Sequence, residues 1–271
     1  GRQTTDQAKR AEIYKKAQQL MYDEMPVIPV APGQTVTLPF NPELAPTHML
    51  LSQAHEYAAL PPDQQEQVRH HLTEITVVLI KTMISDQMGF IRLGREYVDI
   101  EALEQLAAHR IGEGKIGGKA AGLLLAWKML EREDPDDEMD LRGHIVLPES
   151  FYIGADVFYD FHALNGLDQY INQKYKTPEE IQADYPLIQQ RYAAARFPEN
   201  ELAHLRRLPS EVGDAPLIVR SSSLLEDNFG FSFAGKYESI FCPNQGTPDE
   251  NLQALTHAIS QIYASVLGPD A

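Results

Sequence analysis

The chain has 271 residues, 43% of them hydrophobic, which is enough to bury the core of one large domain or two modest ones. Its formal charge of −16 argues against a nucleic-acid partner or an anionic membrane surface. The single cysteine, Cys242, excludes an internal disulfide and any metal site that needs several cysteines. No apolar run approaches the ~18 residues of a membrane span, and no signal peptide is visible. These features predict a cytoplasmic protein.

Residues 1–46 are predicted to form a helix followed by a Pro-rich linker. Residues 6–25 have helical composition with apolar residues about one turn apart, and prolines end the pattern. The run over residues 8–30 resembles the C-terminal segment of extracellular peptide-type solute-binding proteins. That resemblance implies extracellular ligand binding as one alternative function.

Residues 47–110 are predicted to be a helical segment. Helices are expected over residues 48–60 and 64–85, because two prolines separate them and the second carries apolar residues mostly three or four apart. A third helix is expected to begin at Asp99, whose short polar side chain is a good helix cap. The histidines of this segment have no cysteine or carboxylate partners at metal-ligand spacing, so no metal site is predicted.

A glycine-rich turn leads into a helix in the run IGEGKIGGKAAGLLLAWKML, residues 111–130. Such a turn can present backbone N–H groups and the positive end of the helix dipole to an anion, and Lys119 adds a mobile positive charge. Ala120 stands where a Walker A loop requires Ser or Thr, and no strand is predicted before the turn, so neither a P-loop nor a dinucleotide-binding fingerprint is indicated. Alternatively, the glycines only join two helices tightly and Lys119 is solvated.

The next part of the chain alternates short extended pieces with helices. The elements expected there are strands over residues 144–148 and 150–153 and helices over residues 156–164, 177–196 and 200–207. Thr followed by Pro and two acidic residues is a strong helix start, and it occurs at Thr177 and again at Thr247.

The most informative stretch runs from Pro216 to Cys242, PLIVRSSSLLEDNFGFSFAGKYESIFC. Its apolar start predicts a buried strand over residues 216–219, which delivers Arg220 and three serines into a loop. Arginine offers a planar fork to phosphate oxygens, while serine hydroxyls and backbone N–H groups add donors. A second strand is expected over residues 237–242, so the pair with its Gly-containing loop is similar to a flap over a nucleotide. An ordinary hairpin with a polar loop is the alternative.

The two motifs together resemble one family. GGKAAGL, followed about a hundred residues later by VRSSSLLEDNFGFSFAGKY, resembles the N-terminal nucleotide-binding domain of phosphoenolpyruvate synthases and pyruvate phosphate dikinases. IVLPESFYIGADVFYDF between them and AISQIYASVL near the end are similar to further passages of that domain. The resemblance implies an α+β fold, in which a helical segment precedes the N-terminal part of an ATP-grasp-like domain over residues 111–271, truncated at its C-terminus.

The resemblance also implies roles for single residues. Lys119 would contact ATP phosphates, and Arg220 would hold the phosphates that are transferred, which makes it the candidate catalytic residue. Gly235 would bring its backbone close to the nucleotide, and Ser239 stands where the family usually has a hydroxyl residue. The predicted nucleotide-binding residues are Lys119, Arg220, Ser221, Ser222, Gly235 and Ser239.

The reaction implied by the resemblance is stepwise. ATP with Mg²⁺ phosphorylates a histidine on a separate domain, and that histidine passes the phosphate to pyruvate or another acceptor. The metal ligands, the histidine domain and the acceptor site are expected beyond Ala271, so this chain alone is expected to bind ATP without full catalysis. A regulatory nucleotide-sensing module without transfer chemistry is the main alternative.

Overall fold

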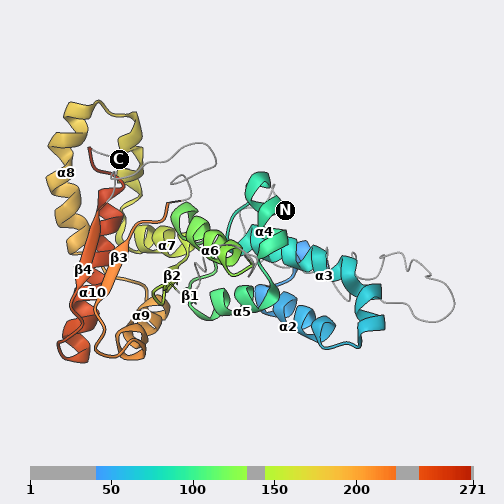
Figure 1. Cartoon of the computed structure of the whole chain (residues 1–271). Coiled ribbons are helices and arrows are strands. Elements are labelled where there is room, and N and C mark those ends of the chain that lie inside the picture. The colour runs from blue at the N-terminus through green and yellow to red at the C-terminus, as the bar shows by residue number, and fades with distance from the viewer. Residues whose placement is uncertain (1–40, 133–143, 224–237, 270–271) are drawn as a thin grey trace, which may run out of the picture. The chain divides into compact units, whose positions relative to one another are not determined.

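The computed structural model describes residues 41–132, 144–223 and 238–269 (Figure 1). The helix predicted over residues 6–25 lies outside them. Contacts divide the chain into two units, residues 1–78 and residues 79–271, and each is described by itself. The mixed α+β fold class is confirmed, with mostly helices and short strands. Within the described ranges, no helix is both long and apolar enough to cross a membrane.

The first unit is helical. It contains the 3-10 helix η1 (Pro42–Leu44), α2 (Thr47–Ala58) and most of α3 (Pro62–Met83). Gln65 donates side-chain hydrogen bonds to the carbonyl oxygens of Ala58 and Leu60 at 2.8 and 2.7 Å, which fixes the turn between α2 and α3. The rings of Tyr57 and His71 stack between the two helices with centroids 6.3 Å apart. Both helices agree with the predicted ones to within two residues at each end.

The second unit begins in the last turns of α3 and continues with α4 (Met88–Tyr97) and α5 (Ile100–Ala108). The prediction for Asp99 is confirmed, because its side chain accepts a hydrogen bond from the Ala102 backbone nitrogen at 2.8 Å. Sequence reasoning did not define α4, which is short and begins without a side-chain cap. Gly94 lets α4 lie close to α3, since a Cβ there would be 3.3 Å from the Ile80 side chain.

A two-stranded parallel sheet precedes the glycine-rich turn. β1 (Arg110–Ile111) pairs with β2 (Tyr152–Ile153), and each strand leads toward a helix, α6 (Gly118–Leu130) or α7 (Ala155–Asn165). The expectation that no strand precedes the turn is therefore wrong. With two residues, β1 is too short to show the alternation by which a strand is recognised in a sequence.

The strand expected over residues 144–148 is also wrong, because this stretch has no regular structure. Val146 is 89% exposed there, and Pro148 has no N–H group to donate to a neighbouring strand. Apolar residues alone therefore did not make this segment a strand.

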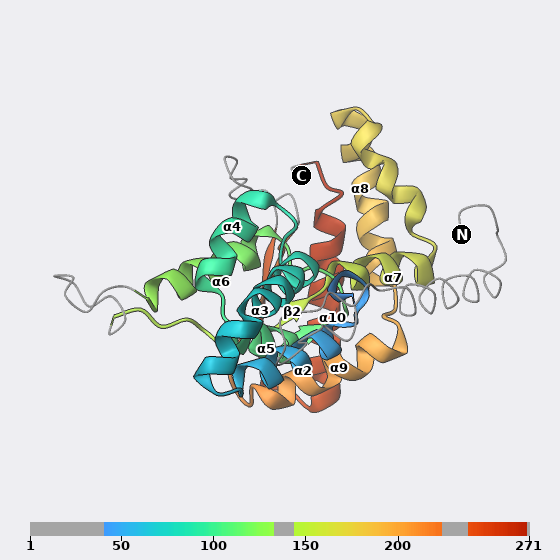
Figure 2. The same ribbon diagram turned by 90° about the vertical axis from the view of Figure 1, so that its right-hand side faces the viewer.

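The core of the second unit gathers around α10 (Pro248–Ser265), which packs on α8 (Pro178–Ala193), α9 (Glu199–Glu211), β3 (Leu217–Arg220) and β4 (Ser239–Cys242). The two strands are labelled beside α10 in Figure 1, and the helices α8 and α9 are labelled around α10 in Figure 2. The strands are antiparallel. Leu217 and Val219 pack against the core, whereas Ile218 and the opposing Phe241 are 61% and 64% exposed. The predicted strand is present over residues 217–220, but it is only half-buried, because α10 covers the face that carries Leu217 and Val219 while the other face is exposed.

Capping boxes fix the starts of α8 and α10. The Thr177 hydroxyl accepts a hydrogen bond from the Glu180 backbone nitrogen, while the Glu180 carboxylate accepts one from the Thr177 nitrogen. Thr247 and Glu250 repeat this arrangement at α10. Both predicted helix starts are confirmed. The 3-10 helix η2 (Asp168–Tyr175) lies before α8.

The helix α9 runs four residues past its predicted end at residue 207. A helix end before Pro209 agrees with the general rule that helical geometry is disfavoured for the residue before a proline. Pro209 is nevertheless part of the last turn of α9, where it is buried in the core with Leu205 and Leu208. Tertiary packing therefore outweighs the local preference.

A buried histidine lies in this core. His162 and Tyr192 have no exposed surface, and the Tyr192 hydroxyl lies 2.7 Å from Nε2 of His162. The Phe158 ring packs on the imidazole with centroids 4.1 Å apart. Burial lowers the pKa of His162, while the Asp168 carboxylate acts in the opposite direction. The imidazole is therefore neutral in the folded protein at neutral pH.

Protonation of His162 is expected to destabilise the protein in acid. Because the pKa of His162 is lower in the folded state than its unfolded value of about 6.5, the unfolded chain binds more protons in that range. The free energy of unfolding should fall as pH drops from about 6.5 toward the folded-state pKa, as measured by urea unfolding across this range. His162→Gln should flatten this part of the profile, whereas the exposed His204→Gln should not. An equally steep profile in His162→Gln would contradict this account.

Candidate functional site

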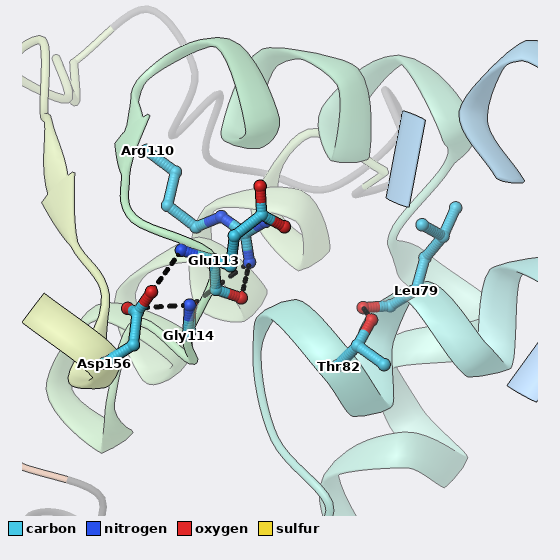
Figure 3. A network of polar contacts seen from close by, with 6 residues as sticks. All are labelled: Leu79, Thr82, Arg110, Glu113, Gly114 and Asp156. Atoms are coloured by element: carbon cyan, nitrogen blue, oxygen red, sulfur yellow. Dashed lines mark hydrogen bonds and ion pairs between the residues drawn. The ribbon is translucent and has the colours of Figure 1, made fainter. Parts of the chain in front are cut away.

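The glycine-rich turn between β1 and α6 is held by two charged side chains (Figure 3). The Asp156 carboxylate, from the first turn of α7, accepts hydrogen bonds from the backbone nitrogens of Glu113 at 2.6 Å and Gly114 at 2.8 Å. Arg110 donates from Nη1 to the carbonyl oxygens of the same two residues at 3.0 and 3.1 Å. Charge-assisted bonds are stronger than neutral ones, so the backbone of the turn is firmly fixed.

Arg110 keeps its charge although its side chain is only 4% exposed. Burial lowers the pKa of Arg110, and the carboxylates of Glu113 and Asp156 oppose that shift. Because the ordinary pKa of arginine lies far above neutral pH, the guanidinium stays protonated and remains a donor.

Glycine is required at two positions because other backbone groups approach so closely. A Cβ on Gly114 would lie 2.6 Å from the backbone nitrogen of Asp156. A Cβ on Gly117 would lie 1.5 Å from the carbonyl oxygen of Ser222, and Gly117 has a φ of 83°, which L side chains rarely adopt. The turn therefore depends on Gly114 for its contact with the start of α7 and on Gly117 for its contact with the segment after β3.

The start of α6 is bonded to that segment. The Gly118 nitrogen donates to the Ser223 carbonyl oxygen at 2.9 Å, and the Ala120 nitrogen donates to the Ser222 hydroxyl oxygen at 2.9 Å. Gly117 occupies the cap position of α6 and offers no side-chain acceptor, so Ser222 supplies one from 102 residues away in sequence. The two sequence motifs therefore form one structural unit.

These bonds correct one part of the sequence interpretation. The start of α6 was expected to present its backbone N–H groups to an anion, but those of Gly118 and Ala120 already have protein partners. The positive end of the helix dipole remains, with Lys119 half-buried in the first turn and Arg220 exposed at the end of β3. The role of these two side chains toward an anion stays a prediction.

The remaining lysine of the turn is engaged elsewhere. Lys115 Nζ lies 2.9 Å from a carboxylate oxygen of Asp86, in the connection between α3 and α4. The hydrogen bond and the charge of Lys115 lower the pKa of Asp86. This ion pair offsets the charge of Lys115, while Lys119 lies in the first turn of α6, next to Ala120, which is bonded to Ser222.

Comparison with known proteins gives the family. A family model described as the pyruvate phosphate dikinase AMP/ATP-binding domain matches residues 113–271, which is more than half of the chain and includes both motifs. The chain belongs to this dikinase family. No curated protein and no solved structure matches it. The resemblance found in the sequence is therefore confirmed, and residues 113–271 are an ATP-binding domain of the dikinase family.

The predicted site residues of this dikinase-family domain fall at the junction of β3, β4 and α6. Arg220 pairs in register with Ser239 across the antiparallel strands, and both are exposed. Ser221 is buried, with 6% exposure, and Ser222 contacts the start of α6. Gly235 lies outside the described residues. The roles of these residues toward a nucleotide stay predictions.

No group of three or more His, Cys, Asp or Glu side chains that could hold a metal ion occurs in the part of the chain that the structure describes.

Sequence reasoning missed Asp156. In the sequence this residue looks like an ordinary acidic residue in the first turn of a helix, two positions after Gly154. Its partners are 42 and 43 residues away, and they became apparent only when β1 and β2 were seen to pair. The signal available in the sequence was the density of glycines in the turn. Closely spaced glycines indicate that other backbone groups approach closely, but they do not identify which residue does so.

Asp156→Asn should destabilise the glycine-rich turn. An amide of the same shape loses the charge and one of the two acceptor oxygens, so one of the two charge-assisted hydrogen bonds to the turn is lost at a cost of about 1–3 kcal/mol in unfolding free energy. Urea unfolding measures the change. Asp160→Asn, on the exposed side of the same helix, is the matched control and should change stability little. Equal stabilities of the two variants would refute the assigned role of Asp156.

Proposed function

We propose that this chain is the ATP-binding portion of a dikinase-type phosphotransferase, and that Lys119 and Arg220 together bind the ATP phosphates. One observation carries the proposal. The bonds from Gly118 and Ala120 to Ser223 and Ser222 hold the first turn of α6 against the residues that directly follow Arg220. Lys119 and Arg220, which are distant in the sequence, therefore extend from two backbone segments that are bonded to each other.

The chemistry of these side chains suits a polyphosphate. Arginine binds two phosphate oxygens with its planar fork, and lysine contributes a flexible point charge. Both lie near the N-terminus of α6, where the helix dipole favours negative charge. Phosphoryl transfer depends largely on positioning and charge neutralisation, which makes Arg220 the proposed catalytic residue.

The rest of the proposed reaction takes place outside the described residues. ATP phosphorylates a histidine on a separate domain, and that histidine carries the phosphate to pyruvate or another acceptor. The Mg²⁺ ligands are proposed to belong to the second lobe of an ATP-grasp domain, and no step assigned to the described residues uses the metal. The chain alone is proposed to bind ATP without completing the transfer, and its cytoplasmic location stays a prediction.

Replacing either cation should weaken ATP binding while the fold persists. Lys119→Met and Arg220→Met each remove charged hydrogen bonds to phosphate, worth about 1.5–3 kcal/mol, which corresponds to roughly tenfold to hundredfold weaker binding of Mg·ATP. Isothermal calorimetry on the 271-residue chain measures the affinity, and circular dichroism checks the fold.

Matched controls separate the site from general charge. Lys128→Met removes a lysine from the last turn of the same helix, and Arg206→Met removes an exposed arginine of α9. Each has the same charge change as its partner variant and should leave Mg·ATP affinity unchanged. If controls and site variants lose affinity equally, or if the wild-type chain binds no Mg·ATP, the proposed function is wrong.

A further inference from the structure

The helix that carries Lys119 is capped by a residue from the other motif. A helix start leaves backbone N–H groups without intrahelical partners, and the residue at the cap position usually supplies an acceptor from its own side chain. In α6 that residue is Gly117, which has no side chain, and the Ser222 hydroxyl accepts the Ala120 N–H instead, at 2.9 Å. The cap and the helix are 102 residues apart in sequence.

The surrounding contacts show that this cap has little freedom. The Ser222 carbonyl lies so close to Gly117 that a Cβ there would be 1.5 Å from its oxygen. The neighbouring Ser223 carbonyl accepts the Gly118 N–H at 2.9 Å, so two successive residues after β3 are bonded to the first turn of α6. Ser222 is half-buried, and water competes less for such a bond than for an exposed one.

We propose that Ser222 is a positioning residue, which fixes Lys119 and Arg220 relative to each other before ATP binds. This inference rests on the proposed function. Ser222 follows Arg220 by two residues, and its bonded partner, Ala120, directly follows Lys119. The hydroxyl therefore sets the distance between the backbone segments from which the two cations extend.

Holding the two backbone segments in place before ATP binds matters because it reduces the ordering that binding itself requires. A ligand that must order two long side chains and two backbone segments loses affinity to that ordering. Displacement of a binding group by about 1 Å can reduce function by a hundredfold. Loss of the Ser222 hydroxyl should therefore weaken phosphate binding even though Lys119 and Arg220 are still present.

The test compares Ser222→Ala with Ser222→Thr and with Thr177→Ala in the 271-residue chain. Thr177 caps α8 through the same kind of hydroxyl-to-backbone bond, so Thr177→Ala removes an equivalent cap from a helix that takes no part in the site. Two quantities are measured: Mg·ATP affinity by calorimetry, and hydrogen exchange of the Ala120 amide by NMR in the absence of nucleotide.

Ser222→Ala is expected to weaken Mg·ATP binding roughly tenfold or more and to speed exchange of the Ala120 amide without nucleotide. Ser222→Thr, which keeps the hydroxyl, should restore both, and Thr177→Ala should change neither. Exchange is decisive because a hydroxyl that served only as a phosphate ligand would leave the nucleotide-free amide unaffected.

Unchanged affinity or unchanged Ala120 exchange in Ser222→Ala, while the wild-type chain binds Mg·ATP, would overturn the positioning role and leave the proposed function standing. Failure of Ser222→Thr to restore binding would likewise overturn the role of the hydroxyl. If the wild-type chain binds no Mg·ATP, the proposed function fails, and the assigned role of Ser222 fails with it.

Discussion

The hydrogen bond between the Ala120 amide and the Ser222 hydroxyl is the contact on which the candidate site depends. The cap position of the helix α6 is held by Gly117, which has no side chain to cap it, and Ser222, 102 residues after Ala120, supplies the missing acceptor. The bond from the Gly118 nitrogen to the Ser223 carbonyl oxygen joins the same two segments. Gly117 makes this approach possible because its place leaves no room for a side chain. Without these bonds, the position of Lys119, in α6, relative to Arg220, at the end of β3, would be less firmly fixed.

To bind an anionic ligand, the positive groups at the candidate site have to outweigh the negative net charge of the protein. A chain with a formal charge of −16 repels an anionic ligand at long range. At physiological ionic strength, however, charges on the surface are screened beyond about 8 Å, so the groups next to the ligand dominate. Among the described residues of this region, Asp86 offsets Lys115 and Arg110 binds backbone carbonyl groups, whereas Lys119 and Arg220 lie beside the junction of α6 with the segment after β3.

Much of the fold could be predicted from the sequence where the signal is local. The caps Asp99, Thr177 and Thr247 each act within three residues, so their helix starts were readable directly. The GGK and VRSSS motifs were recognisable, and the family match confirms the resemblance that they suggested.

The contacts that build the site could not be predicted, since they join residues far apart in the chain. Asp156 binds a turn 42 residues before it, and the Ser222 hydroxyl completes a helix 102 residues before it, and neither side chain looks unusual in its own segment. The short strand β1 escaped notice for a related reason, because two residues carry no pattern and only pairing with β2 defines the strand.

The most direct test of the central claim is an NMR titration of the wild-type chain with Mg·ATP, which follows the backbone amides of both motifs. If the start of α6 and the segment from Arg220 to Ser222 form one phosphate site, the amides of Lys119 and Arg220 should shift together and saturate with a single dissociation constant. Saturable shifts at only one of the two segments, or different dissociation constants for them, would show that they do not form a single site.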